Sequence, residues 1–453
     1  MPNAAFTYVR LHKVPILLTL LSIGFYYTFA YALVRTDFIK LCALYFALFF
    51  LCSKLIQFEK WNFKFLLLIG ILFRLVFLLA TPTLSQDFYR FIWDGELIVL
   101  GVNPYVYLPS ELVTKSEFLI PHAQELVDGM GSLSANHYSN YPPFNQALFA
   151  LSVWLGGTSI MGSLIAMRLF LLAADVGIFY FGRKLLKKMN RSPHLIFWYF
   201  LNPLVIIEIS GNVHYEGVML FFLLWALYLL IMQRWILAAI PLALSVSVKL
   251  VPLMFLPLFF KHLGIVKGAF FNALILVIAW FTFIPFYDPQ FADHYLATLS
   301  LWFSNFEFNA GIYNGIKQLG LLFEAKPWEL IKVYGKITAL MIICWVFLLT
   351  VVRRNQQPKV LLNSLLFVLT AYFFLASTVH PWYLISLVLL CLFTDYRFPL
   401  VWAATVVLSY SAYANPDFNE SLGLLAIEYL AVFGFLSYEI FKRGVFKSLI
   451  PKN

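Results

Sequence analysis

Long apolar runs alternate with short polar segments along the whole chain. The first three runs lie near residues 13–35, 38–57 and 64–81, and each is long enough to cross about 30 Å of hydrocarbon as a helix. Similar runs recur to the end of the sequence, without a regular repeat or a soluble-domain linker. The pattern predicts one all-α polytopic membrane domain over residues 1–453, with about 11 to 14 transmembrane or re-entrant helices.

Composition supports this prediction. Of the 453 residues, 62% are hydrophobic and only 12% are charged, whereas a soluble chain carries about 25% charged residues. The net charge of +10 would by itself fit a nucleic-acid-binding protein. The basic residues gather in short loops, however, which the positive-inside rule assigns to the cytoplasm, and no nucleic-acid partner is expected. These loops are 183–191, 261–267, 353–359 and the tail 441–453.

The longest polar interruption, residues 82–143, is acidic. It contains seven acidic residues and only two basic ones, Arg90 and Lys115, so it is predicted to be a large first loop on the non-cytoplasmic face. The segment 324–336 would place three lysines on the same face. This departure indicates either an error in the topology or cations that face an anionic ligand. Later segments assigned to this face are 211–217, 286–290, 304–311, 379–383 and 415–420.

Residues 235–260 are apolar but contain Pro241, Pro252 and Pro257. Each proline removes a backbone donor from a helix, so this segment is predicted to be broken or re-entrant. Lys249 lies inside it. A lysine at membrane depth faces a cavity or a partner, or extends its ammonium group to the interface.

The densest group of carboxylates follows the third apolar run, in SQDFYRFIWDGELIVLGVNPY (85–105). Asp87, Arg90 and Asp94 are spaced i, i+3 and i+7, which places them on one face of a helix that carries aromatic residues elsewhere. We expect an amphipathic helix at the membrane interface. Asp94 or Glu96 would equally fit a helix cap or an ion pair with Arg90.

A carboxylate at this depth has a chemical use. If a sugar donor were attached to a lipid phosphate, its anomeric carbon would lie at the membrane boundary. Asp87 would then deprotonate an acceptor hydroxyl while the phosphate departs. The departing phosphate needs cationic or hydrogen-bond stabilisation, for which the candidates are His214, Lys249, His380 and the lysines of 326–336.

The chain resembles the GT-C integral-membrane glycosyltransferases that use polyprenyl-phosphate sugars. The likeness is greatest to bacterial polyprenyl-phosphate-mannose-dependent mannosyltransferases and to the catalytic subunit of the first GPI mannosyltransferase. Besides 85–105, the segments that carry it are YSNYPPFNQAL (138–148), LNPLVIIEISGNVHYEGV (201–218), VSVKLVPLMFLPL (246–258), FEFNAGIYNGI (306–316) and STVHPWYL (377–384).

The resemblance implies that Asp87 is the catalytic base of an inverting single displacement. Many relatives carry two acids at this point, whereas Gln86 precedes Asp87 here, which argues against a metal-binding acidic pair. No metal ligands and no cofactor are expected, and a need for a divalent metal stays open. The expected substrate-binding residues are Arg90, Asp94, Tyr141, Asn212, His214, Glu216, Lys249, Asn309, His380 and Tyr383.

These candidates have simpler interpretations as well. Tyr141 would either stack on a sugar or simply belong to a turn with the two prolines that follow it. The polar residues of 211–217 would either be functional or form an ordinary solvated turn, and the sequence is the same in both cases. Trp and Tyr near 379–383 are expected at membrane interfaces in any case.

The predicted function is transfer of a hexose from a polyprenyl-phosphate donor to a lipid-linked or glycan acceptor on the non-cytoplasmic face. Mannose is the favoured candidate for this hexose. The expected location is a bacterial cytoplasmic membrane, with the endoplasmic reticulum as the alternative, and membrane lipids surround the protein. The need for a partner subunit stays open. The alternatives are a transporter or flippase of polyprenyl-linked saccharides, or a non-catalytic subunit. Transporters often carry two paired broken helices, and only one broken segment is evident here.

Overall fold

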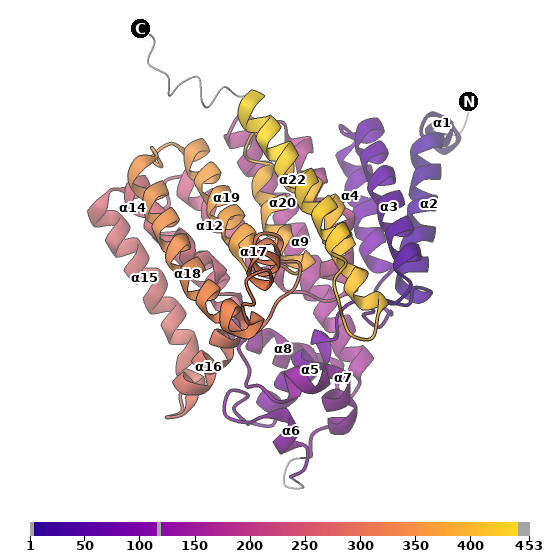
Figure 1. Ribbon diagram of the computed structural model, residues 1–453. Coiled ribbons are helices and arrows are strands. Elements are labelled where there is room, and N and C mark those ends of the chain that lie inside the picture. The colour runs from indigo at the N-terminus through magenta and orange to yellow at the C-terminus, as the bar shows by residue number, and fades with distance from the viewer. Residues whose placement is uncertain (1–3, 116–118, 443–453) are drawn as a thin grey trace. The chain divides into compact units, whose positions relative to one another are not determined.

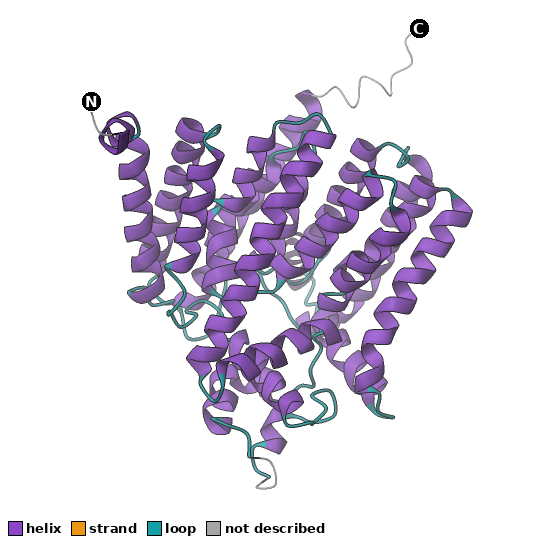
Figure 2. Cartoon of the chain, turned by 180° about the vertical axis from the view of Figure 1, so that it is seen from behind, coloured by secondary structure: helices purple, strands orange, loops and turns teal. Residues whose placement is uncertain are grey.

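The structure is a computed structural model that describes residues 4–115 and 119–442, and it is helical throughout this range (Figures 1 and 2). Seven of the described helices are long and apolar enough to cross a membrane, or eight if a helix pair bent by 50° counts as one span. Five shorter apolar helices accompany them. The predicted all-α polytopic fold is therefore confirmed. Most of the basic tail, from residue 443 on, lies outside the described residues.

The contacts within the chain divide it into two compact units. The first unit comprises Met1–Leu253 and Ala269–Ser300, and the second comprises Met254–Gly268 and Leu301–Asn453. A single functional domain over the whole chain stays a prediction.

The first unit begins with membrane helices and continues through the predicted external loop. Asp37 and Asn62 cap the helices that follow them, since their side chains accept hydrogen bonds from the backbone N–H groups of Lys40 and Phe65. Its elements are α1 (Ala4–Leu11), α2 (Lys13–Tyr31), α3 (Phe38–Glu59), α4 (Phe63–Leu75), α5 (Asp87–Val99), α6 (Pro109–Leu112), α7 (Ala123–Ala135), α8 (Pro143–Gly156), α9 (Ile160–Lys188), η1 (Pro193–Ile196), α10 (Phe197–Phe200), α11 (Pro203–Val205), η2 (Ile206–Gly211), α12 (Glu216–Ile231), α13 (Trp235–Val248) and η4 (Ile284–Phe286). Two further helices, α15 (Ile265–Phe283) and α16 (Phe291–Ser304), extend beyond this unit.

A buried ion pair joins two helices of the first unit, α4 and α9. Nε of Arg74 on α4 lies 2.7 Å from a carboxylate oxygen of Asp175 on α9, and both side chains are almost fully buried. The hydroxyl of Tyr199 donates to the other oxygen of Asp175. Because an isolated charge is costly inside a membrane protein, these mutual bonds fix the positions of α4, α9 and α10.

Arg168 on α9 determines where the neighbouring bent segment ends. Its guanidinium donates to the carbonyl oxygens of Ser210 (2.7 Å), Gly211 (3.0 Å) and Leu78 (3.1 Å). The first two belong to η2, a π-helical turn that has carbonyl groups without helical partners at its end. Arg168 therefore connects the end of η2 to the segment that follows α4. Each of these two segments is followed by residues of the candidate site described below, Asn212–Glu216 and Ser85–Asp87.

The segment 235–260 changes conformation at Lys249. The helix α13 accommodates Pro241 and ends at Val248, and Lys249 itself is extended, with φ −148° and ψ 139°. A 3₁₀ turn, η3 (Val251–Phe255), and a short helix, α14 (Leu256–Leu263), follow. The chain passes from the first unit to the second within η3.

The second unit is also helical. The backbone of Phe308 pairs with the segment 377–379, since its N–H donates to the carbonyl of Ser377 (3.0 Å) and its carbonyl accepts from Val379 (2.8 Å). This pairing holds the two connecting segments side by side. Besides α14, its elements are α17 (Gly311–Leu321), α18 (Pro327–Val352), α19 (Pro358–Leu375), η5 (Pro381–Leu384), α20 (Ile385–Cys391), α21 (Phe398–Thr405), η6 (Val406–Ala414) and α22 (Leu422–Lys442).

Candidate active site

Asp87 is the first residue of α5, and its side chain is 39% exposed. Its backbone N–H donates to Oγ of Ser85 (3.2 Å). The N-terminus of a helix carries a partial positive charge, which favours the ionised carboxylate. The chain therefore presents a carboxylate that is accessible and held at a helix end.

His214 lies between two carboxylates. It is buried in the turn between η2 and α12, with Nε2 3.7 Å from a carboxylate oxygen of Asp87 and Nδ1 3.2 Å from Glu208. Burial alone would lower the pKa of His214, but the nearby carboxylates of Asp87, Glu208 and Glu216 raise it to about 9. At neutral pH the ring is thus an imidazolium that links the exposed Asp87 to the buried Glu208.

The backbone next to His214 is strained. Val213 has φ +64°, a region that β-branched residues avoid and that persists only where the surroundings enforce it. Two hydrogen bonds of the neighbouring Asn212 help to hold this conformation. Its amide donates to Glu208 (3.0 Å), and its side-chain oxygen accepts from the N–H of Leu84 (3.3 Å). Together with Arg168 on the preceding carbonyls, these bonds hold His214 towards the start of α5.

Lys249 has an acidic partner within the first unit. Its ammonium group forms an ion pair with Glu216, the first residue of α12. Glu216 is almost fully buried and Lys249 is 22% exposed. Because Tyr215 alone separates Glu216 from His214, the ion pair lies close to the Asp87–His214–Glu208 group along the chain.

Arg90 and Asp94 belong to a closed network instead. Asp94 is fully buried, and its oxygens accept from Arg90 Nε (2.7 Å), Ser139 Oγ (2.6 Å) and Gln146 Nε2 (2.9 Å). Arg90 also donates to the backbone carbonyls of Ser134 and His137. The charged face of α5 meets protein, since α7 and α8 pack against the helix. This arrangement supports a role in joining α5 to the rest of the loop, and direct substrate contact stays a prediction.

Tyr141 packs in an aromatic cluster. Its ring stands edge-on to Phe91 and Phe149, at centroid distances of 5.1 Å and 5.5 Å, and its carbonyl accepts from the hydroxyl of Tyr105 (2.6 Å). Tyr215 contacts the same two phenylalanines. The cluster connects the end of the external loop to the turn that holds His214, and a sugar contact by Tyr141 stays a prediction.

The remaining predicted residues belong to the second unit. Asn309 is fully buried and donates to Glu420 (2.5 Å) and to Glu428 (3.0 Å). The ring of His380 stacks against Trp382 and Phe308, at centroid distances of 4.3 Å and 5.0 Å. Their predicted contacts with substrate are untested by this geometry.

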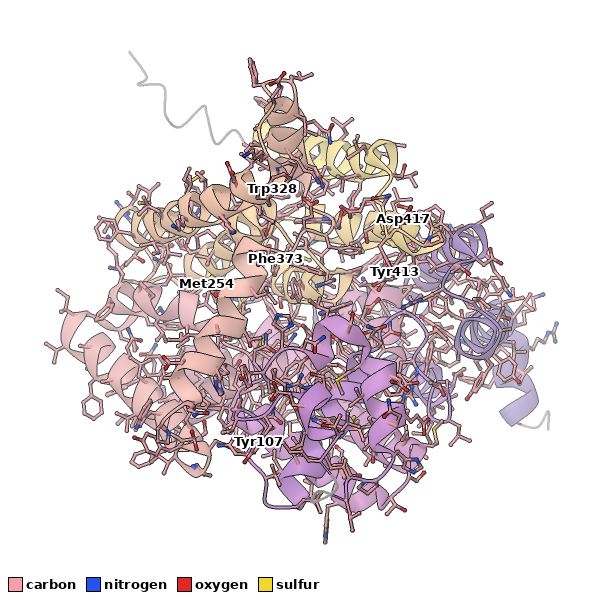
Figure 3. The ribbon with its side chains drawn as sticks, turned by 60° about the horizontal axis from the view of Figure 1, so that its bottom comes forward. Tyr107, Met254, Trp328, Phe373, Tyr413 and Asp417 are labelled. Carbon is pink, nitrogen blue, oxygen red and sulfur yellow. The ribbon has the colours of Figure 1, made fainter. Side chains whose placement is uncertain are left out.

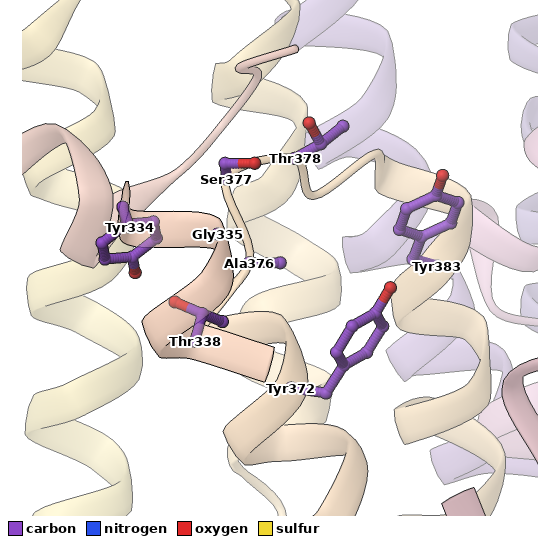
Figure 4. A pocket seen from close by; sticks show the side chains of 8 residues that line it. All are labelled: Tyr334, Gly335, Thr338, Tyr372, Ala376, Ser377, Thr378 and Tyr383. Atoms are coloured by element: carbon purple, nitrogen blue, oxygen red, sulfur yellow. The ribbon is translucent and has the colours of Figure 1, made fainter. Parts of the chain in front are cut away.

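Tyr383 borders a cavity of about 40 Å³ that is formed by α18, α19 and the segment leading into η5 (Figure 4). A volume of this size holds about three water molecules. The side chains that line it are rich in hydroxyl groups, and they come from Tyr334, Thr338, Tyr372, Ser377, Thr378 and Tyr383.

Glu208 was missed by the sequence analysis. It lies inside an apolar stretch, IIEIS, where it was not singled out. An acidic residue in such a stretch usually faces the interior of the bundle and marks a functional site, so this signal was present. No group of three or more His, Cys, Asp or Glu side chains in the described part of the chain is placed to hold a metal ion.

The helical fold and this group of ionised side chains define a multi-pass integral membrane protein with an accessible carboxylate at a helix end. Residues 9–264 match the family model described as "Alpha-(1->6)-mannopyranosyltransferase, N-terminal domain". The match covers more than half of the chain, so the protein belongs to this family of membrane mannosyltransferases. The resemblance to mannosyltransferases of the GT-C type is thereby confirmed.

A curated relative carries the same description. The Alpha-(1->6)-mannopyranosyltransferase B of Corynebacterium glutamicum is 27% identical over 153 residues, which are 34% of this chain and 24% of that protein. The match thus spans about a quarter of the length of the relative.

Proposed function

We propose that the protein transfers mannose from a polyprenyl-phosphate donor to a lipid-linked or glycan acceptor on the non-cytoplasmic face of a membrane. The observation that carries the proposal is the exposed Asp87 beside the buried pair of His214 and Glu208. Membership of a mannosyltransferase family supports the reaction class. The bacterial relative supports a location in a bacterial cytoplasmic membrane.

Asp87 acts as the general base in this proposal. One of its oxygens takes the proton of the acceptor hydroxyl, whose oxygen attacks the anomeric carbon of the donor. The bond between that carbon and the phosphate oxygen breaks, and its electron pair leaves with the phosphate. A single displacement of this kind inverts the anomeric configuration.

His214 positions and balances the base. Its imidazolium favours the ionised form of Asp87, which must be free of a proton before the acceptor binds. A cation alone would also weaken Asp87 as a base. Glu208 offsets this effect, because it shares the positive charge of His214 from the side opposite to Asp87.

Lys249 is the candidate for the leaving phosphate within the same unit. Negative charge grows on the phosphate oxygens as the bond breaks, and a nearby ammonium group stabilises it. The ion pair with Glu216 holds the flexible lysine side chain in place before the donor arrives. Asn212 acts indirectly, through its bond to Glu208.

The reaction is tested with the purified full-length protein in nanodiscs. Labelled polyprenyl-phosphate mannose is supplied with a panel of glycan and lipid-linked acceptors, and the anomeric configuration of the product is determined by NMR. The proposal expects a mannosylated product with the opposite configuration to the donor. Movement of the labelled donor across vesicle membranes, without transfer to any acceptor, would favour the transporter instead.

A further inference from the structure

One face of α18 combines cations with side chains typical of a lipid contact. Trp328, Lys332 and Lys336 follow each other at one-turn spacing, and all three are exposed. The same stripe continues along the helix as exposed Leu340, Ile343 and Phe347. The opposite face is buried, at Tyr334, Thr338 and Ile342. Trp328, which is 62% exposed, is labelled in Figure 3.

The length of α18 places the lysines at the membrane boundary. The helix has 26 residues, and at 1.5 Å per residue it is about 39 Å long, compared with about 30 Å of hydrocarbon. The chain is apolar up to Val352, so the surplus of about six residues lies at the N-terminal end of the helix. Lys332 then lies at headgroup level and Lys336 one turn deeper.

The two lysines lack a neutralising acidic partner in the part of the chain that the structure describes. Among the described residues neither forms an ion pair, while Lys326 pairs with Glu329 and Lys317 pairs with Glu307. Like charges one turn apart on a helix repel each other. At the lipid boundary an anion from the surroundings relieves this repulsion better than water does.

We propose that Trp328, Lys332 and Lys336 bind the phosphate headgroup of an anionic phospholipid. The acyl chains of such a lipid cover the exposed apolar stripe of α18, its phosphate accepts from both ammonium groups, and Trp328 lies at the depth that indole rings prefer. A zwitterionic headgroup brings its own cation and binds less well. This site would explain why the lysines of 324–336 lie on the non-cytoplasmic face, since they would face an anionic ligand. It does not depend on the proposed transfer reaction.

Quenching by brominated lipids tests the proposal. The full-length protein is placed in phosphatidylcholine vesicles that contain either brominated phosphatidylglycerol or brominated phosphatidylcholine at the same mole fraction. The fluorescence of Trp328 is obtained as the difference between the wild type and Trp328→Phe. We expect a preference of roughly thirtyfold for phosphatidylglycerol, from two lysines near the surface.

Lys332→Gln/Lys336→Gln should abolish this preference. The matched control is Lys187→Gln/Lys188→Gln, which removes the same charge from exposed positions at the end of α9 and should keep it. Equal quenching by both lipids in the wild type would overturn the proposal. So would a preference that survives in the first double variant, or displacement of phosphatidylglycerol by a trace of polyprenyl phosphate, which would assign the site to the carrier lipid.

Discussion

Asp87 and Asp94 lie on the same helix, seven residues or about two turns apart, and their surroundings differ completely. Asp94 is fully buried and accepts hydrogen bonds from Arg90, Ser139 and Gln146. Asp87 is 39% exposed and lies beside His214. One carboxylate is enclosed by the protein, whereas the other remains accessible to a substrate.

This difference separates stability from activity. Removing the charge of Asp94 leaves the buried Arg90 without its counter-ion, which is costly because the site excludes water. Removing the charge of Asp87 disturbs a partly solvated group and leaves the fold intact. The same substitution, Asp to Asn, is therefore expected to lower mainly stability at position 94 and mainly activity at position 87.

The largest effect is expected for Asp87→Asn. The amide keeps the size of the side chain but does not accept a proton, so the transfer rate should fall by about 10²- to 10⁴-fold. Donor binding should change little, and the melting temperature should fall less than in Asp94→Asn, because Glu208 stays beside the buried His214. Single-turnover transfer and donor titration on the same preparation measure both quantities. A rate within about twofold of the wild type would remove Asp87 from the mechanism.

Asp94→Asn should mainly destabilise the protein. Breaking the buried pair with Arg90 is expected to cost about 3 to 5 kcal/mol, while the molecules that fold should transfer mannose at close to the wild-type rate. Thermal unfolding in detergent and the transfer rate per folded molecule provide the measurements. Loss of transfer in a variant of unchanged stability would show that Asp94 shares the catalytic role.

The pH dependence of stability tests the charge on His214. Its pKa is raised from 6.5 to about 9 in the folded protein, so its contribution is complete below pH 6.5 and is lost as the pH rises through about 9. The amplitude is on the order of 3 kcal/mol. The melting temperature should decline over this window in the wild type. The decline should be much smaller in His214→Gln and should persist in a control, His122→Gln, which alters an exposed histidine.

Glu208→Gln should have the smallest effect of the four. Without this carboxylate the pKa of His214 falls towards its ordinary value, so the imidazolium is lost at a lower pH. We expect a rate reduced by about tenfold at neutral pH and an alkaline limb that moves to lower pH. The pH profile of the transfer rate measures this, with exposed Glu111→Gln as the matched control. An unchanged pH profile would show that Glu208 has no effect on the transfer step.

The sequence predicted the fold well because the membrane leaves few choices. A backbone in hydrocarbon must satisfy its own hydrogen bonds, so the apolar runs near 13–35 and 38–57 became α2 and α3 with only small differences in their ends. The break near Lys249 lies where the prolines indicated. The bend between α10 and α11 was not anticipated, although Pro203 follows it. The π-helical turn η2 was not anticipated either, and its last carbonyl groups are bound by Arg168, which is distant along the chain.

The site was only partly predictable. The acidic loop and the motif around His214 indicated two of its residues, and the structure brings Asp87 and His214 to 3.7 Å. Arg90 and Asp94 looked equally suited to bind substrate. Their enclosure depends on Ser139 and Gln146, which are 45 and 52 residues from Asp94 along the chain. Such long-range side-chain contacts have no local sequence pattern.

The most direct test of the account is the transfer rate per folded molecule for Asp87→Asn and Asp94→Asn, measured side by side in nanodiscs with polyprenyl-phosphate mannose. We expect Asp87→Asn to be folded and inactive, and the folded fraction of Asp94→Asn to be active. Equal loss of activity in both folded variants, or an active Asp87→Asn, would show that Asp87 is not the catalytic base.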